Sequence, residues 1–190
     1  YIDGGTGDDT ITGDSGMDSM QGSGGMDTYY DTSGSHSSGM DTFAGSVGGD
    51  DTIFGADGYD DIAGGAGNDY IDGGADGDTI SGDDGADTIF GSEGYDVISG
   101  DAGNDYIDGG TGDDTITGDS YMDSMQGSGG MDTFAGSSGG DDTIFGADGY
   151  DDIAGGAGND YIDGGADGDT ISGGAGDDTI FGADGYDNIY

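Results

Sequence analysis

The sequence predicts an all-β protein built from short repeats, and three observations lead to this prediction. Nearly the whole chain divides into nine-residue units that begin with glycine, such as GGAGNDYID at Gly64–Asp72. Each unit carries aspartate at its sixth position and one large apolar residue, usually isoleucine, at its eighth. The 190 residues include 50 glycines and no proline. Self-similarity at a fixed short period is the sequence signature of a repeat architecture.

The repeat is regular along the chain, with a few departures that can be named. We count about 20 units. Two of them have ten residues, Gly45–Phe54 and Gly136–Phe145. Glycine at the fourth position is replaced at Asp76, Tyr121 and Asp167. The eighth position holds an apolar or aromatic residue other than isoleucine at Met20, Tyr29, Phe43, Met125 and Phe134.

The charge of the chain is extreme and entirely of one sign. There are 43 acidic residues and no lysine or arginine, for a formal net charge of −43. This composition alone favours a disordered, self-repelling chain, unless positive charge arrives from outside as metal ions. Because no cationic side chain can meet a phosphate, nucleic-acid binding is excluded. No apolar run approaches the length of a membrane span.

The unit pattern G-G-x-G-x-D-x-U-x, where U is a large apolar residue, resembles the nonapeptide of the RTX family (repeats in toxin) from end to end of the chain. The resemblance implies a right-handed parallel β-solenoid, or β-roll, with two nonapeptides per coil and about ten coils. It also implies that the first six residues of a unit form a calcium-binding turn and the last three a short strand. Rows of calcium ions would lie between stacked turns, bound by position-six carboxylates and turn carbonyls.

The chemistry of the repeat agrees with this implication. Calcium takes six to eight hard oxygen ligands, and glycine-rich turns can direct several carbonyls to one point. In a strand only the middle residue of the last three faces the interior. About 18 ions, roughly one per unit, would bring roughly +36 against −43 and leave an ordinary surface charge. The predicted calcium ligands are Asp9, Asp18, Asp27, Asp41, Asp51, Asp60, Asp69, Asp78, Asp87, Asp96, Asp105, Asp114, Asp123, Asp132, Asp142, Asp151, Asp160, Asp169, Asp178 and Asp187.

The sequence offers no catalytic constellation, and we expect the protein not to be an enzyme. Adjacent aspartates such as Asp8 and Asp9 could be interpreted as an acid–base pair, but the metal role already accounts for one member. His36 is the only histidine and has no cysteine or basic residue to form a nucleophilic site. We interpret it as a solvated loop residue.

Longer internal repeats indicate one domain, residues 1–190, that is a window of a longer tandem array. Tyr1–Thr28 recurs at Tyr106–Thr133, with Gly16 changed to Tyr121, and Asp41–Gly82 recurs at Asp132–Gly173, with Val47 changed to Ser138. The two offsets differ because of extra residues around positions 31–38. That stretch lacks the turn pattern, and we expect an inserted loop or bulge there.

Alternate units should build opposite sheets, which places aromatic residues on one outer face. The predicted aromatic face comprises Phe54, Tyr70, Phe90, Tyr106, Phe145, Tyr161 and Phe181, interrupted at Ser124–Gln126. The opposite face carries small and polar residues. The rings could merely stack and stiffen the sheet, or the face could mediate self-association.

These features predict a calcium-binding structural segment of a secreted or cell-surface bacterial protein, such as a rod, filament, sheath or adhesin stalk, that folds in extracellular calcium. One alternative is the C-terminal secretion and folding module of a type I secreted enzyme or toxin. Another is a ligand-binding or ice-binding face of an adhesin. The third position argues against ice binding, because no uniform threonine ladder runs along it.

Overall fold

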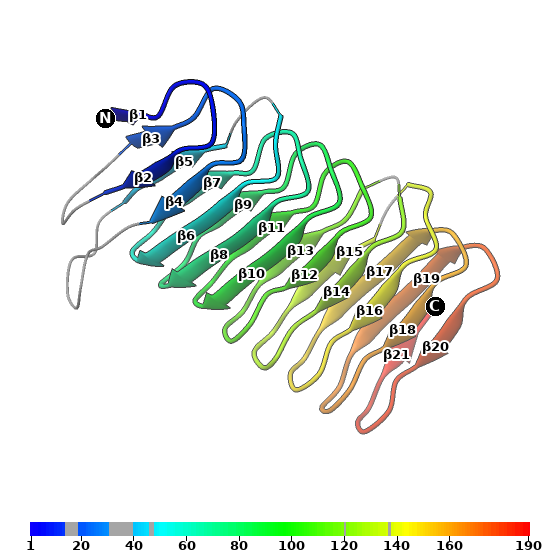
Figure 1. The fold of residues 1–190 in the computed structure, drawn as a ribbon. Helices are drawn as coiled ribbons and strands as arrows, with labels where there is room; N and C mark the ends of the chain where they lie inside the picture. The colour runs from blue at the N-terminus through cyan, green and yellow to red at the C-terminus, as the bar shows by residue number, and fades with distance from the viewer. Residues whose placement is uncertain (14–18, 31–39, 46–47, 120, 137) are drawn as a thin grey trace.

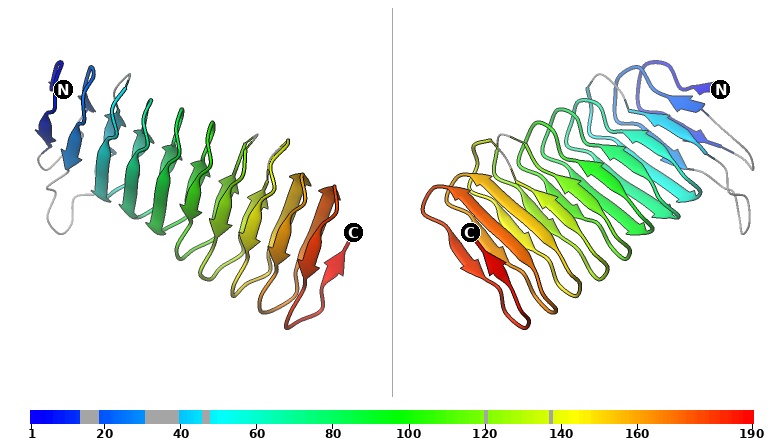
Figure 2. Two further views of the ribbon diagram at one scale, coloured as in Figure 1. Left: turned by 45° about the vertical axis from the view of Figure 1, so that its right-hand side comes forward. Right: turned by 180° about the vertical axis from the view of Figure 1, so that it is seen from behind.

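Two parallel β-sheets face each other and run the length of the molecule. The computed structural model describes residues 1–13, 19–30, 40–45, 48–119, 121–136 and 138–190. Strands alternate strictly between an 11-stranded and a 10-stranded sheet, so each coil contributes one strand to each. Figures 1 and 2 show the coils stacked along one axis from the N-terminus to the C-terminus. The predicted all-β parallel solenoid, with two units per coil and about ten coils, is confirmed.

The strands follow the repeat, most of them three residues long. The 11-stranded sheet contains β1 (Ile2–Asp3), β3 (Ser19–Gln21), β5 (Thr42–Ala44), β7 (Asp61–Ala63), β9 (Thr79–Ser81), β11 (Val97–Ser99), β13 (Thr115–Thr117), β15 (Thr133–Ala135), β17 (Asp152–Ala157), β19 (Thr170–Ala175) and β21 (Asn188–Ile189). The 10-stranded sheet contains β2 (Thr10–Thr12), β4 (Thr28–Tyr30), β6 (Thr52–Asp57), β8 (Tyr70–Ala75), β10 (Thr88–Glu93), β12 (Tyr106–Asp108), β14 (Ser124–Gln126), β16 (Thr143–Phe145), β18 (Tyr161–Asp163) and β20 (Thr179–Phe181).

The register places identical repeat positions side by side. Ile71 of β8 pairs with Ile89 of β10, and Ile89 pairs with Ile107 of β12. Because side chains alternate across a strand, only the eighth position of each unit points between the sheets. These residues form one continuous core that is one side chain wide in each sheet.

The residues that depart from isoleucine at the eighth position are buried as predicted. Tyr29, Phe43 and Phe134 are at most 1% exposed, and so are Met20 and Met125. The Tyr29 hydroxyl donates a hydrogen bond to the carbonyl oxygen of Ala44 at 3.2 Å, which satisfies its polar end within the core. Core side chains of different sizes therefore occupy the same buried position in the coil.

The outer face of the 10-stranded sheet carries a row of aromatic rings. Neighbouring rings lie 5.4–5.9 Å apart, centroid to centroid, along Tyr30–Phe54–Tyr70–Phe90–Tyr106 and again along Phe145–Tyr161–Phe181. We call these eight residues the aromatic row. Its predicted position is confirmed, Tyr30 is an addition to it, and strand β14 interrupts it.

Some predictions fall outside the described residues. The expected loop at 31–38, with His36, lies there, and so does Asp18. None of the described residues belongs to a helix that is long and apolar enough to cross a membrane.

Candidate metal sites

The position-six aspartates lie at the ends of the turns, immediately before the strands, and nearly all of them are buried. Asp9, Asp178 and Asp187, near the two ends of the roll, are partly buried. The fully buried members are at most 3% exposed: Asp27, Asp41, Asp51, Asp60, Asp69, Asp78, Asp87, Asp96, Asp105, Asp114, Asp123, Asp132, Asp142, Asp151, Asp160 and Asp169. Charged side chains are almost never fully buried without a partner, so each of these positions requires an explanation.

One oxygen of most of these carboxylates belongs to a hydrogen-bond ladder between coils. The amide N–H of Asp69 donates to Oδ1 of Asp87 at 2.8 Å, and the amide of Asp87 donates to Oδ1 of Asp105 at 2.8 Å. A second ladder follows the other edge, where the amide of Asp78 donates to Oδ1 of Asp96 at 2.8 Å. The structure thus has two rows of carboxylates, one along each edge of the roll.

The second oxygen of most of these carboxylates is buried and accepts no hydrogen bond. Within the described residues this holds for Oδ2 of Asp9, Asp69, Asp78, Asp87, Asp96, Asp105, Asp114, Asp132, Asp151, Asp160 and Asp169. Buried polar atoms are normally hydrogen-bonded, and a charged one without a partner is costly. Buried carboxylate oxygens without hydrogen-bond donors, repeated in successive coils, are the arrangement expected of cation ligands.

Glycine at the first position of the unit leaves space beside this oxygen. A Cβ atom added to Gly82 would lie 2.5 Å from Oδ2 of Asp87 and 2.7 Å from the carbonyl oxygen of Gly100. The same arrangement recurs at Gly64, whose added Cβ would lie 2.7 Å from Oδ2 of Asp69. A carboxylate oxygen and a carbonyl oxygen of the next coil therefore border a space that no side chain can occupy.

Burial raises the pKa of several of these carboxyl groups, among them Asp69, Asp78 and Asp87. Loss of solvation is the largest cause, and it raises the pKa of Asp78 to about 8, that of Asp87 to about 7 and that of Asp69 to about 6. The N–H of the preceding coil lowers each pKa in part, while neighbouring carboxylates raise it further. Because the chain has no lysine or arginine, only protons or external cations can neutralise these groups.

The carboxylates alone do not form a complete coordination shell. Among the described residues, no three aspartate, glutamate, histidine or cysteine side chains converge on one point. Carbonyl oxygens must therefore supply further ligands. A set of only hard oxygen donors suits calcium, and it contains neither the sulfur nor the nitrogen ligands that zinc and copper favour.

Two of the three turns that lack the fourth glycine keep the regular arrangement. Asp76 and Asp167 adopt left-handed backbone angles, with φ of 75° and 77°, a conformation that aspartate tolerates better than most residues. Asp78 and Asp169, two residues further on, remain buried with Oδ2 free of hydrogen-bond donors. Replacement of the fourth glycine by aspartate therefore leaves these two carboxylates in the regular arrangement.

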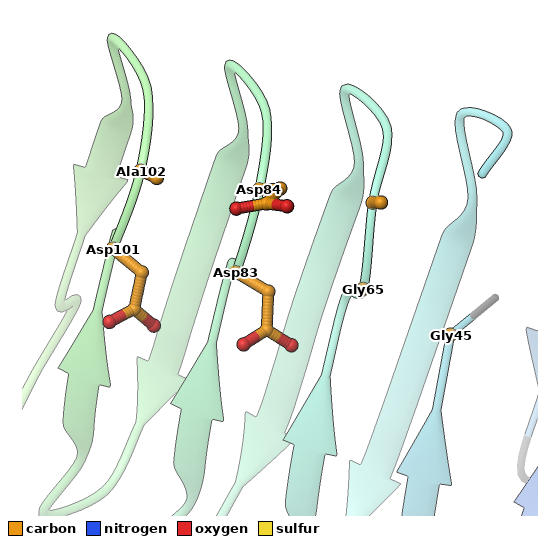
Figure 3. A pocket seen from close by; sticks show the side chains of 7 residues that line it. Gly45, Gly65, Asp83, Asp84, Asp101 and Ala102 are labelled. Atoms are coloured by element: carbon orange, nitrogen blue, oxygen red, sulfur yellow. The ribbon is translucent and has the colours of Figure 1, made fainter. Parts of the chain in front are cut away.

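A second group of acidic residues was not predicted from the sequence. A shallow groove of ≈ 440 Å³ beside the 11-stranded sheet is bordered by Asp83, Asp84 and Asp101 (Figure 3). The Ser81 hydroxyl lies within hydrogen-bond distance of both Asp83 and Asp101. The available sequence signal was aspartate at the second position of two units on adjacent coils. These carboxylates are partly or fully exposed, and serine hydroxyls are hydrogen-bond partners of Asp83 and Asp101.

Two parallel sheets, a core one residue wide and rows of buried carboxylates along both edges define a metal-binding parallel β-roll. The family model for the RTX calcium-binding nonapeptide repeat (4 copies) matches residues 1–30, 46–80, 81–116, 108–141, 117–153, 137–171 and 155–189. The chain therefore belongs to the RTX calcium-binding repeat family, as the resemblance of its units implied. No curated protein matches the chain.

Proposed function

We propose that this chain is a calcium-held structural rod of a secreted or cell-surface bacterial protein, and that it folds when it meets extracellular calcium. The observation that carries the proposal is the repeated buried Oδ2 atom without a hydrogen-bond donor. In a chain without lysine or arginine, external cations are the only permanent positive charges that can balance these carboxylates.

The position-six aspartates of both rows would hold the ions, together with backbone carbonyls of neighbouring coils. Roughly one ion per nonapeptide would neutralise most of the net charge of −43. Each ion would join two coils that otherwise share a short strand pairing and one buried side chain per sheet. Calcium would therefore act as a fixed cross-link that supplements a core too thin to be stable alone.

The need for calcium suggests where the chain works. Weak calcium sites of extracellular modules bind at ~10⁻⁴–10⁻³ M. In cytoplasm, where calcium is scarce, uncompensated charge would keep the chain expanded and ready for export as an unfolded polypeptide. Outside, ion binding and folding would be one event. About ten coils at ~4.8 Å give a rod ~48 Å long, which suits a spacer or stalk. The sequence on either side of this chain in its parent protein distinguishes that role from a folding module attached to a secreted enzyme.

The test is a calcium titration of the chelated protein, followed by circular dichroism and small-angle scattering. Calcium should convert an expanded coil into a compact rod, while magnesium at equal ionic strength should not. Asp87→Asn removes a buried row carboxylate, and Asp84→Asn, the matched control, removes the same charge from an exposed position. Only Asp87→Asn should shift the calcium midpoint upward. A compact β signal that survives complete chelation at neutral pH would contradict the proposal.

A second candidate function, lateral self-association, is favoured by the exposure of the aromatic row. Six of its eight rings are 37–49% exposed, although each contacts its neighbours. Two apolar ridges on one face of a rod, separated at β14, make a large exposed apolar surface for a monomer, and a second parallel rod could cover both. Sedimentation velocity across a wide concentration range in calcium tests this candidate directly.

A further inference from the structure

One turn on the edge that contains Asp105 carries tyrosine at the position where neighbouring turns approach each other most closely. Tyr121 occupies the fourth position of the unit Gly118–Gln126, where glycine is the rule. The unit Gly13–Gln21 has the same sequence except for glycine at this position. The chain itself thus supplies the regular counterpart of the altered unit.

The fourth position has no room for a side chain in regular turns of the same edge. A Cβ atom added to Gly85 would overlap the carbonyl oxygen of Gly67, and one added to Gly103 would overlap the carbonyl oxygen of Gly85. Tyr121 carries a Cβ and a ring that is 55% exposed. Position 121 therefore cannot make the regular close approach to the preceding coil, although the Met122 amide still donates to Oδ1 of Asn104 in that coil at 3.2 Å.

The hydrogen bonds of this turn change accordingly. In a regular turn the fourth amide donates to the next coil, as Gly85 does to the carbonyl of Ala102 at 2.8 Å. The Tyr121 amide donates to Oδ1 of Asp119 at 2.9 Å, within its own turn. The turn is thus stabilised in part by a hydrogen bond between two of its own residues.

This local closure satisfies the carboxylate that should face a cation. Oδ1 of Asp123 accepts the Asp105 amide at 3.0 Å, as in the regular ladder. Oδ2 of Asp123 accepts the Asp119 amide, also at 3.0 Å. In the preceding coil of the same row, Oδ2 of Asp105 has no donor. Both oxygens of Asp123 are therefore satisfied by the protein, and a calcium ion would have to displace a hydrogen bond.

The same coil also interrupts the aromatic row. Strand β14 presents Ser124 and Gln126 outward, and the Gln126 amide donates to Oδ2 of Asp108 at 2.6 Å. No ring contact among the described residues joins Tyr106 to Phe145 across this strand. Two features that hold neighbouring coils together, the contact between turns and the stacking of aromatic rings, are thus both altered at this coil.

We propose that Asp123 holds no calcium ion in the folded roll, and that its coil separates two calcium-held blocks, one ending at β12 and one beginning at β16. The inference rests on the proposed function, because it concerns one site among the predicted calcium sites. The break at Tyr121 would allow one block to fold or open without the other.

The experiment counts bound ions by native mass spectrometry in calcium and uses paired variants. Tyr121→Gly restores the sequence of Gly13–Gln21 and should add one ion. Asp123→Asn should leave the ion count of the parent chain unchanged, but should remove one ion in the Tyr121→Gly background. Asp105→Asn, the matched control in a regular turn, should remove one ion in either background. Hydrogen exchange at limiting calcium should show two separately protected blocks in the parent chain and one in Tyr121→Gly.

The outcomes separate this inference from the proposed function. A loss of one ion in Asp123→Asn of the parent chain, or no gain in Tyr121→Gly that is folded by circular dichroism, overturns the inference while calcium binding stands. If Tyr121→Gly fails to fold, the ion count of Asp123→Asn in the parent chain still decides. If the parent chain binds no calcium at all, both the proposed function and the inference fail.

Discussion

The amide N–H of Asp69 lies 2.8 Å from Oδ1 of Asp87, one coil away, while Oδ2 of Asp87 is buried without any donor. In most row carboxylates one oxygen thus joins the coils and the other is left for a cation, while both oxygens of Asp123 accept amide hydrogen bonds. Because the same side chain serves both purposes, stacking of coils and binding of ions are coupled. Along most of the roll the ladder forms together with burial of the second oxygen, and burial of that oxygen is costly until a cation or proton compensates it.

The close approach of turns can be tested with two glycines on the same edge that differ only in their surroundings. An added Cβ at Gly67 would overlap the carbonyl oxygen of Gly49, whereas one at Gly139 would meet nothing within 4 Å. Neither glycine has left-handed backbone angles, so the comparison isolates steric contact. Gly67→Ala should destabilise the calcium-loaded roll by about 1–3 kcal/mol, and Gly139→Ala by much less. Urea unfolding at saturating calcium measures both, and equal effects would contradict the stacking of turns described here.

The core one residue wide makes each eighth position important. Ile89 is 0% exposed and packs in register with Ile71 and Ile107. Ile89→Ala should lower the free energy of unfolding by about 2–5 kcal/mol and raise the calcium midpoint. Val97→Ala, at a position that is 52% exposed, is the control with little expected effect. A small loss for Ile89→Ala would show that ions, rather than the core, provide nearly all the cohesion.

Protonation should partly replace calcium. Burial raises the pKa of Asp78 to about 8 and that of Asp87 to about 7. Since these values lie above the ordinary value of 3.8, the folded state binds protons more tightly than the unfolded state does. Calcium-free chain should therefore gain β structure in acid and lose it as the pH rises from about 4 through about 8.

The measurement is circular dichroism of calcium-stripped protein over this pH range. High salt at pH 7.5 is the control, because it screens repulsion without protonating the buried groups. If salt alone restores as much structure as acid does, general charge repulsion rather than carboxylate burial is the cause. In calcium the dependence should reverse, with affinity falling as the pH drops below these pKa values, because calcium binds the carboxylate form.

The fold could be predicted from the sequence because the position of a residue in the nine-residue unit determines several of its structural properties. The position of Ile89 in its unit determines its strand, its sheet and its burial. The membership of Tyr30 in the aromatic row was missed, because the insertion before Met40 obscured which sheet the earlier units join. The contact of Asp119 with Asp123 could not be predicted either. A repeat pattern identifies which residues face a turn, but the donor that satisfies a particular oxygen depends on the path of the backbone around Tyr121.

The last prediction concerns the aromatic row and distinguishes a stiffened rod from an associating one. Replacing Phe54, Phe90, Phe145 and Phe181 with serine removes four rings and the contacts they make with Tyr30, Tyr70, Tyr106 and Tyr161. Each lost ring pair should cost about 0.5–1.5 kcal/mol, so the variant should need more calcium to fold but still reach the same β signal. If the row binds a second copy, the variant should also stay monomeric at concentrations at which the parent chain associates.

The matched control carries serine in place of four outward threonines of the other sheet, Thr79, Thr115, Thr133 and Thr170. It should associate as the parent chain does, because its aromatic row is intact. Light scattering and sedimentation velocity in saturating calcium compare the three proteins. If the aromatic row binds a second copy, high concentration should drive two rods to bury it. If the parent chain stays monomeric at every concentration, the row does not bind a second copy, and the exposed rings serve only to stiffen the sheet by stacking.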